Sequence, residues 1–376
     1  MPSAYRYLFN RLKSVYTPRE ARAVALLLLD KLCHLSVVDI CAGRDKMHFK
    51  DVPASPHQHS RESVGLSSEK NRDNRRNIGV FSGNILGFSG NVLDFCDGVG
   101  VDAGDAARVA CANEHIISEE RDVYLGKGCK NALAGTDSGG GERVVPGYVI
   151  ERLLRGEPVQ YVLGECDFCG RSFVVTPDVL IPRPETAELT LWVVDEVKGL
   201  PKRRILDIGT GSGCIAVTLS KELQDARVTA VDISSAALNV ARENAEQHDA
   251  DVTFREGDIL STGFGAPHTE DSDRWDVIVS NPPYVCRSER EGMGKEVRDY
   301  EPDIALFVPD DDPLVFYHHI AGYAVRHLSA EGLLFVEINE RFGNEVSDLF
   351  REEGFRHVEV RKDMQGRDRM IKCIRI

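Results

Sequence analysis

The sequence lacks any apolar run of the roughly 20 residues that a membrane-spanning helix needs. The nearest candidate, Val24 to Leu29, runs into Asp30 and Lys31. The N-terminal residues also contain no apolar core of the signal-peptide type before charged residues return. From these two absences we expect no membrane segment and a cytoplasmic protein.

Basic residues are too few for a protein that coats nucleic acid. The 46 lysines and arginines stand against 60 aspartates and glutamates, which gives a net charge of -14. Affinity for the phosphate backbone comes mainly from lysine and arginine. The charge balance therefore argues against stable binding to DNA.

The ten cysteines are scattered along the chain, unlike the dense pattern of a small disulfide-bonded secreted domain. They indicate reduced thiols. Cys166 and Cys169 form a C-x-x-C pair, but no second pair stands at ligand spacing. We interpret the pair as structural and predict no metal site.

The 376 residues divide into stretches of different composition. Residues 1–163 contain helix-forming runs such as Ala21 to Leu35 and are predicted to form a small helical N-terminal domain. Glycine and small polar residues dominate about 49–146, which buries too little surface to offset chain entropy and is predicted as a disordered insertion. Residues 164–186 are predicted as a hairpin linker and 187–376 as an α/β domain.

Strand and helix patterns alternate from residue 204 onward. The strands are expected at 204–209, 227–233, 251–256, 275–280 and 332–338. The helices are expected at 213–223, 235–248, 314–328 and 344–353. This alternation is typical of a doubly wound parallel sheet. Two final strand-like runs, 357–362 and 370–376, are joined by a short turn and should pair antiparallel at one edge.

A glycine loop separates the first of these strands from its helix. Gly209, Gly211 and Gly213 occupy every second position, and a loop without Cβ atoms lets the backbone approach a ligand at the helix N-terminus. The dinucleotide fingerprint would continue with glycine at the sixth position, where this chain has Cys214. Taken alone, the loop is equally compatible with a tight turn that binds nothing.

Acidic residues identify the favoured ligand of this loop. Asp207, Asp232 and Asp258 stand at the ends of three successive predicted strands. A carboxylate can accept hydrogen bonds from ribose hydroxyls but repels a pyrophosphate. The pattern therefore favours an adenosine ligand without phosphates, S-adenosylmethionine, over NAD.

The sharpest signal is Asn281-Pro282-Pro283-Tyr284, which follows the predicted strand 275–280. Proline fixes φ and removes a backbone donor, so the Asn281 side-chain oxygen and the Pro282 carbonyl can converge on one NH2 group. Tyr284 can offer its ring face to a planar amide or base. This constellation suits methylation of a planar, weakly nucleophilic nitrogen, whose developing positive charge two acceptors would stabilise.

These motifs resemble the HemK/PrmC-type methyltransferases, which modify the N5 nitrogen of a glutamine in peptide chain release factors. The resemblance covers roughly residues 147–376. Besides the glycine loop, Asp232 and the NPPY motif, it includes Gly156 to Gly164, Phe168, Phe173, Leu180 to Thr186, Tyr300-Glu-Pro and Ala305-Leu. It implies a Rossmann-like S-adenosylmethionine-dependent sheet, and it makes the N-terminal domain a docking domain for the release factor.

The resemblance also implies roles for individual residues. Cofactor-binding residues would be Gly209, Thr210, Gly211, Ser212, Gly213, Asp232, Asp258, Ile259 and Asn281. Catalytic residues would be Asn281, Pro282 and Tyr284. Substrate-binding residues would be Asn281, Pro282, Pro283, Tyr284 and Arg183. The substrate would be the glutamine of a Gly-Gly-Gln loop in class 1 release factors, and we expect the enzyme to be a monomer.

The expected reaction is a single displacement by the amide nitrogen, which gives N5-methylglutamine and S-adenosylhomocysteine. Two alternatives remain. NPPY also occurs in enzymes that methylate the exocyclic nitrogen of adenine in DNA, although the charge balance disfavours this. The chain could also be a catalytically silent partner protein that only binds S-adenosylmethionine, which the intact Asn281, Pro282 and Tyr284 argue against.

Overall fold

The computed structural model describes residues 4–36, 39–40, 145–200, 203–262, 264 and 274–376. Within these ranges the chain divides into two compact units, one ending at Val162 and the other beginning at Leu163. The predicted insertion at about 49–146 lies outside the described residues except for its last two positions. Its disorder therefore stays a prediction.

The described part of the first unit is helical. Its elements are α1 (Ala4–Leu12), α2 (Pro18–Cys33) and α6 (Gly147–Leu154), and α7 (Val159–Leu163) spans the boundary between the units. Helix α2 begins at a capping box, in which the Thr17 side chain accepts from the Glu20 N–H and the Glu20 carboxylate accepts from the Thr17 N–H. Leu8, Leu28 and Leu153 are fully buried and form part of this unit's core.

A seven-stranded sheet forms the centre of the second unit, in the order β10-β11-β9-β6-β3-β4-β5. The strands are β3 (Arg204–Ile208), β4 (Arg227–Asp232), β5 (Val252–Glu256), β6 (Trp275–Ser280), β9 (Leu328–Glu337), β10 (Arg356–Lys362) and β11 (Asp368–Ile374). Five of them are parallel, whereas β11 pairs antiparallel with both β9 and β10. The predicted fold class, including the C-terminal antiparallel pair, is confirmed for this unit.

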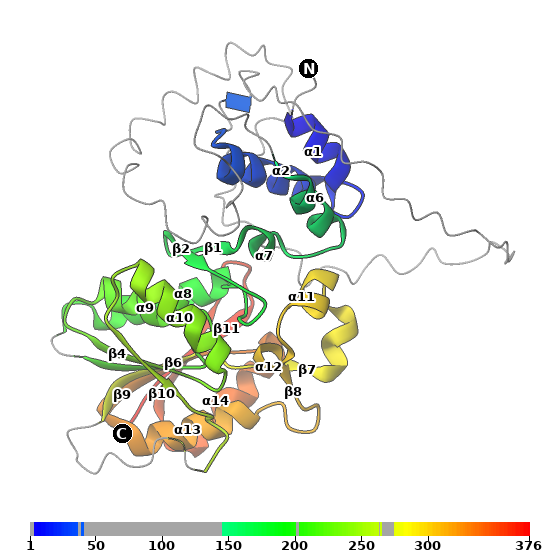
Figure 1. The fold of residues 1–376 in the computed structure, drawn as a ribbon. Helices are drawn as coiled ribbons and strands as arrows, with labels where there is room; N and C mark the ends of the chain where they lie inside the picture. The colour runs from blue at the N-terminus through cyan, green and yellow to red at the C-terminus, as the bar shows by residue number, and fades with distance from the viewer. Residues whose placement is uncertain (1–3, 37–38, 41–144, 201–202, 263, 265–273) are drawn as a thin grey trace, which may run out of the picture. The chain divides into compact units, whose positions relative to one another are not determined.

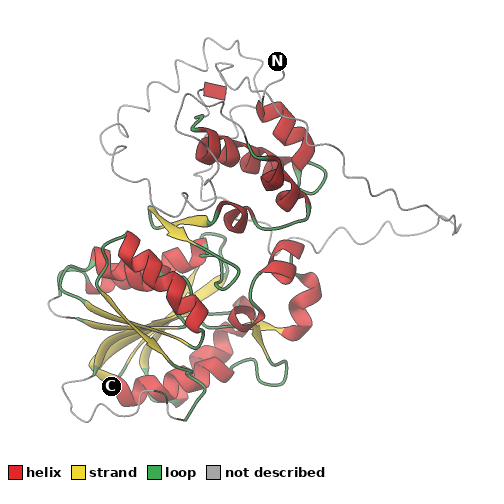
Figure 2. Ribbon diagram, viewed as in Figure 1, coloured by secondary structure: helices red, strands yellow, loops and turns green. Residues whose placement is uncertain are grey.

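Helices cover both faces of the sheet (Figures 1 and 2). On one face lie α8 (Pro184–Val197), α9 (Cys214–Glu222) and α10 (Ser235–Gln247), and on the other lie α13 (Val315–His327) and α14 (Gly343–Glu352). Successive strand residues supply the two cores in turn. Ile205 packs with the first group, and Leu206 packs with the second.

Several smaller elements complete the second unit. They are the antiparallel hairpin of β1 (Glu165–Phe168) and β2 (Arg171–Val174), the short parallel pair of β7 (Val285–Cys286) and β8 (Phe307–Val308), and the helices α11 (Lys295–Tyr300) and α12 (Asp303–Leu306). The hairpin lies inside the segment predicted as a linker. Among the helices that the structure describes, none is both long and apolar enough to span a membrane.

Candidate active site

A cavity of about 290 Å³ lies where β3, β4, β5 and β6 end. The carboxyl ends of parallel strands are the usual ligand-binding edge of an open α/β sheet. Most residues predicted as site residues line this cavity: Arg183, Gly209, Thr210, Gly211, Ser212, Asp232, Asp258, Ile259, Asn281, Pro282 and Pro283. Gly213 and Tyr284 are the two predicted site residues that are not among its lining residues.

Most N–H groups of the glycine loop are used within the chain. Gly209 and Thr210 both donate to the carbonyl of Val231, at 2.8 and 3.0 Å, and Gly211 donates to the Asp232 carboxylate at 2.8 Å. A phosphate-binding loop instead offers such groups to its ligand. The geometry therefore favours a ligand without phosphates, in agreement with the sequence argument.

Gly213 is a packing residue rather than part of the cavity wall. Its φ is +81°, and a Cβ at this position would lie 3.0 Å from the Cβ of Ala241 on α10. Glycine is required here because α9 and α10 approach closely and because the backbone is left-handed. The predicted contact between Gly213 and the cofactor thus has no support from the cavity geometry.

Two strand-end aspartates face the cavity, and each is held by backbone N–H groups. The oxygens Oδ1 and Oδ2 of Asp232 accept from Ser234 and Gly211 at 2.9 and 2.8 Å. Burial raises the pKa of Asp232, and these backbone hydrogen bonds oppose that rise. Asp258 accepts from the N–H of Leu260 at 2.8 Å. Each carboxylate oxygen has a second lone pair, so either residue can also accept from a ligand hydroxyl.

The third strand-end aspartate has a different position. Asp207 is fully buried and accepts a 2.6 Å hydrogen bond from the Thr210 hydroxyl. It is therefore bound to the glycine loop, but it is not among the residues that line the cavity. Burial raises its pKa to about 7.

Apolar side chains follow the two cavity-facing aspartates. Ile233 and Ile259 both line the cavity. Ile233 is 48% exposed, so a bound planar ring would cover apolar surface that otherwise faces water. The sequence analysis identified Ile259 but missed Ile233, although an apolar residue directly after a strand-end aspartate was a visible signal.

The NPPY segment presents two acceptors to the cavity. Asn281 donates through Nδ2 to the Thr186 hydroxyl at 2.9 Å, which leaves its Oδ1 as an acceptor. Among the described residues, none donates a hydrogen bond to Asn281 Oδ1 or to the Pro282 carbonyl oxygen. Since both residues line the cavity, the pair can hold an NH2 group there.

The hydroxyl of Tyr284 is bound to a buried carboxylate. The phenol donates to Oε1 of Glu337 at 2.9 Å, and the ring packs against the cores on either side of it. Burial raises the pKa of the phenol well above its ordinary value, and the nearby Glu337 carboxylate adds to the rise. The phenol is therefore neutral, and the stacking role predicted for its ring stays a prediction.

Arg183 lines the cavity at the start of α8 and is paired with a buried acid. Its Nη2 lies 2.6 Å from Oε1 of Glu301, whose side chain is 1% exposed. The other oxygen of Glu301 accepts from the N–H of Ile181 at 3.2 Å. The ion pair fixes the segment before α8 against the segment after α11.

The C-x-x-C pair lies on the β1–β2 hairpin. Cys166 and Cys169 are free thiols, and burial raises the pKa of Cys169 to about 11. A reactive thiol needs a lowered pKa, so Cys169 is not an activated nucleophile. Within the described ranges, no group of three or more His, Cys, Asp or Glu side chains is placed to hold a metal ion.

The residues around the cavity fit S-adenosylmethionine. Carboxylates at Asp232 and Asp258 can accept from ribose hydroxyls, Ile233 and Ile259 offer apolar surface, and the glycine loop withholds its donors from phosphate. Asn281 and Pro282 line the same cavity, and the described residues donate no hydrogen bond to Asn281 Oδ1 or to the Pro282 carbonyl oxygen. When bound, this cofactor supplies a transferable methyl group.

Comparison with known proteins agrees with this geometry. Residues 188–296 match the Methyltransferase small domain family. The release factor glutamine methyltransferase of Bacteroides thetaiotaomicron is 49% identical over 227 residues, which are 60% of this chain and 79% of that protein. The enzyme of the same name from Flavobacterium psychrophilum is 46% identical over 228 residues, 60% of this chain and 78% of that protein.

Fold, cavity and likeness together define an S-adenosylmethionine-dependent methyltransferase. Within that class, the chain belongs to the release factor glutamine methyltransferase family, which confirms the resemblance found in the sequence.

Proposed function

We propose that this enzyme transfers a methyl group from S-adenosylmethionine to the N5 nitrogen of the glutamine in the Gly-Gly-Gln loop of class 1 release factors. The observation that carries the proposal is the pair of acceptors, Asn281 Oδ1 and the Pro282 carbonyl, on the cavity wall. A primary amide has two N–H donors on one nitrogen, and two acceptors match them.

The chain's own part in the reaction is orientation and charge stabilisation. Asn281 and Pro282 would accept both amide hydrogens and hold the nitrogen in one plane. They would also stabilise the positive charge that the nitrogen gains during transfer. A methylated amide nitrogen is strongly acidic, so its extra proton can leave without a dedicated general base.

Within this proposal the first unit docks the release factor, and the enzyme works as a cytoplasmic monomer. The adenine alternative has the same local chemistry at Asn281 and Pro282. However, the net charge of -14 and the family relationship both favour a protein substrate over DNA.

The decisive experiment incubates the purified enzyme with methyl-labelled S-adenosylmethionine and, in separate reactions, an unmodified class 1 release factor and adenine-containing DNA. Intact mass and fragmentation would locate any added methyl group. We expect one methyl on the glutamine of Gly-Gly-Gln and none on DNA. A release factor with asparagine in place of that glutamine is the matched control and should stay unlabelled.

Each other outcome has a definite meaning. Label on DNA alone would establish the adenine alternative. Cofactor binding without label on either substrate would support the silent partner protein and contradict the proposal.

A further inference from the structure

A chain of buried hydrogen bonds joins the two polar side chains of the NPPY motif. Asn281 Nδ2 donates to Thr186 Oγ1 at 2.9 Å, and the Thr186 hydroxyl donates to Glu337 Oε2 at 2.7 Å. Tyr284 donates to the other oxygen of Glu337 at 2.9 Å. Thr186 and Glu337 are only 3% and 1% exposed. A single carboxylate at the end of β9 is therefore linked to both residues.

The direction of these bonds determines which end of the Asn281 amide faces the cavity. A threonine hydroxyl has one proton, and Thr186 gives it to Glu337. Towards Asn281 it can then offer only a lone pair, so the amide must present its NH2 group there. The oxygen of the amide is consequently left for the substrate. If Thr186 kept its proton for Asn281, the opposite orientation would be favoured.

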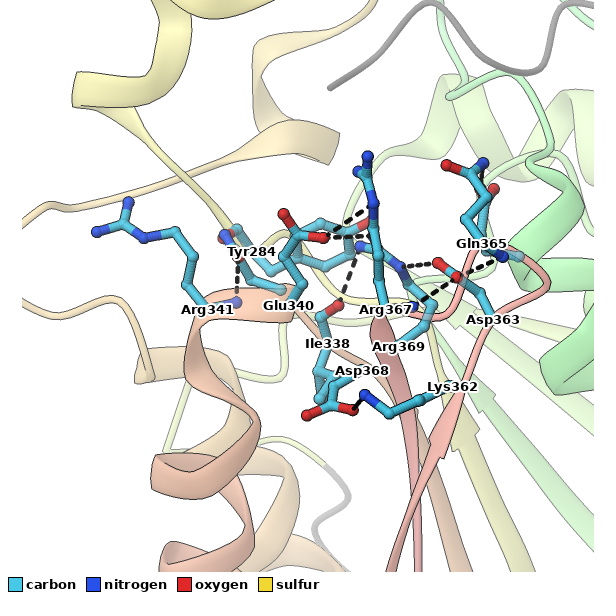
Figure 3. Close-up of polar contacts among 12 residues, drawn as sticks. Tyr284, Ile338, Glu340, Arg341, Lys362, Asp363, Gln365, Arg367, Asp368 and Arg369 are labelled. Carbon is cyan, nitrogen blue, oxygen red and sulfur yellow. Dashed lines mark hydrogen bonds and ion pairs between the residues drawn. The ribbon is translucent and has the colours of Figure 1, made fainter. Parts of the chain in front are cut away.

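Glu337 must stay an acceptor on both oxygens for this direction to hold. Burial raises the pKa of Glu337, whereas the hydrogen bonds from Thr186 and Tyr284 and the charge of Arg369 lower it. Arg369 is itself held in place: it bonds to Asp363 Oδ2 at 3.2 Å and to the Ile338 carbonyl at 3.3 Å (Figure 3). The net shift of the Glu337 pKa is upward, and this fixed cation opposes it. In the structure both oxygens of Glu337 accept hydrogen bonds, as an ionised carboxylate does.

We propose that Thr186 and Glu337 are positioning residues, which keep the Asn281 amide oriented with its oxygen towards the substrate. The inference rests on the proposed function, because the orientation matters only if Asn281 Oδ1 accepts from a substrate NH2 group. Thr186 lines the cavity, but its hydroxyl is engaged by Asn281 and Glu337, and Glu337 is not among the lining residues. Substitutions at both should therefore affect turnover far more than cofactor affinity.

Substitution of Thr186 tests this chain of hydrogen bonds directly. Thr186→Val removes both the lone pair and the proton, so the Asn281 amide can rotate, and we expect kcat to fall by about 10- to 100-fold. The dissociation constant for S-adenosylmethionine, measured by calorimetry, should change by less than about threefold, since the cofactor contacts are intact. Thr186→Ser keeps the hydroxyl and should restore most of the activity.

Glu337→Leu tests the second link. Leucine accepts from neither Thr186 nor Tyr284, so the Thr186 hydroxyl can turn its proton to Asn281. The Asn281 amide would then present its oxygen to Thr186 and its NH2 group to the substrate. We expect a loss of kcat similar to that of Thr186→Val.

The matched control is Thr190→Val, one turn further along α8. Thr190 is fully buried and donates to the Thr186 carbonyl at 2.8 Å. It is thus a buried threonine of the same helix, but it takes no part in the hydrogen bonds that join Asn281 to Glu337. Thr190→Val removes the hydrogen bond to the Thr186 carbonyl and should keep its kcat.

A double-variant cycle with Asn281→Ala separates positioning from a general structural role. If Thr186 acts through Asn281, Thr186→Val should cause no further loss of kcat in the Asn281→Ala background. The inference is overturned if Thr186→Val or Glu337→Leu retains wild-type kcat, if Thr190→Val loses as much, or if the losses of Thr186→Val and Asn281→Ala multiply. Failure of the wild-type enzyme to methylate the release factor would instead overturn the proposed function, and this inference with it.

Discussion

Gly213 at the start of α9 and Ala241 in α10 approach so closely that a methyl group on Gly213 would lie 3.0 Å from the Ala241 Cβ and 3.2 Å from its Cα. Gly213→Ala combines this overlap with a left-handed backbone. We expect it to lower the free energy of unfolding by roughly 2–4 kcal/mol in denaturant titrations.

The matched control for Gly213 is Gly366→Ala. Its φ of +82° is nearly the same, but no atom lies within 4 Å of the added Cβ, so the loss should be only about 1 kcal/mol. Adding Ala241→Gly to Gly213→Ala should recover part of the difference. Equal losses at positions 213 and 366 would show that the overlap with Ala241 is relieved without cost.

Asn281→Ala should abolish most turnover and leave much of the cofactor affinity. The change removes one of two acceptors for the substrate amide, and loss of one such group lowers kcat by about 10²- to 10³-fold. Methyl incorporation into the release factor measures kcat, and calorimetry measures cofactor binding. Asn239→Ala, at an exposed position of α10, is the control. Near-normal turnover in Asn281→Ala would refute the role assigned to Asn281.

Asp232→Asn should mainly weaken cofactor binding. The aspartate accepts from Gly211 and Ser234 at 2.8 and 2.9 Å, and an asparagine would turn its NH2 group towards one of these donors. The substitution would weaken the hydrogen bonds that hold the glycine loop and would remove an acceptor for the ribose hydroxyls. We therefore expect the dissociation constant for S-adenosylmethionine to rise at least about tenfold. Asp225→Asn, an exposed substitution, should have no effect. An unchanged dissociation constant in Asp232→Asn would remove Asp232 from the cofactor site.

The buried Asp207 should make stability depend on pH. Burial raises its pKa from 3.8 to about 7, so the folded state holds a proton that the unfolded state has already lost. Between about pH 4 and pH 7, this group therefore lowers the free energy of unfolding as the pH rises, by up to about 1.4 kcal/mol per pH unit.

Comparison of the wild type with Asp207→Asn isolates that contribution. Asparagine can still accept from Thr210, and it does not titrate, so the variant should gain stability relative to the wild type as the pH rises from 5 to 8. Denaturant titrations at several pH values measure the trend. Parallel curves would mean that Asp207 keeps a normal pKa in the folded protein.

Local patterns in the sequence were sufficient for the parallel sheet and for most of the cavity wall. The runs around Ile205, Val228 and Ile278 are mostly apolar on both faces, as strands covered on both sides require. Strand ends in a parallel sheet meet at one edge, so Asp232, Asp258 and Asn281 could be placed together without coordinates.

Contacts between residues far apart in the chain could not be predicted in this way. Thr186 and Glu337 are 151 positions apart, and only the pairing of β9 beside β6, with α8 packed across them, brings their side chains together. An acidic residue at the end of the predicted strand 332–338 was a visible signal, but nothing local indicated its partner. Likewise, Gly213 has the same local pattern as Gly209, and only the packing of α10 distinguishes the two.

The hydrogen bonds inside the glycine loop bear on competition among metabolites. ATP and NAD share an adenosine group with S-adenosylmethionine, and apolar contacts and a ribose acceptor alone would admit all three. With Gly209, Thr210 and Gly211 already donating to Val231 and Asp232, a phosphate entering the site would lose its water and gain no replacement. These three N–H groups are therefore not offered to a phosphate, and we expect ATP and NAD to compete only weakly with S-adenosylmethionine.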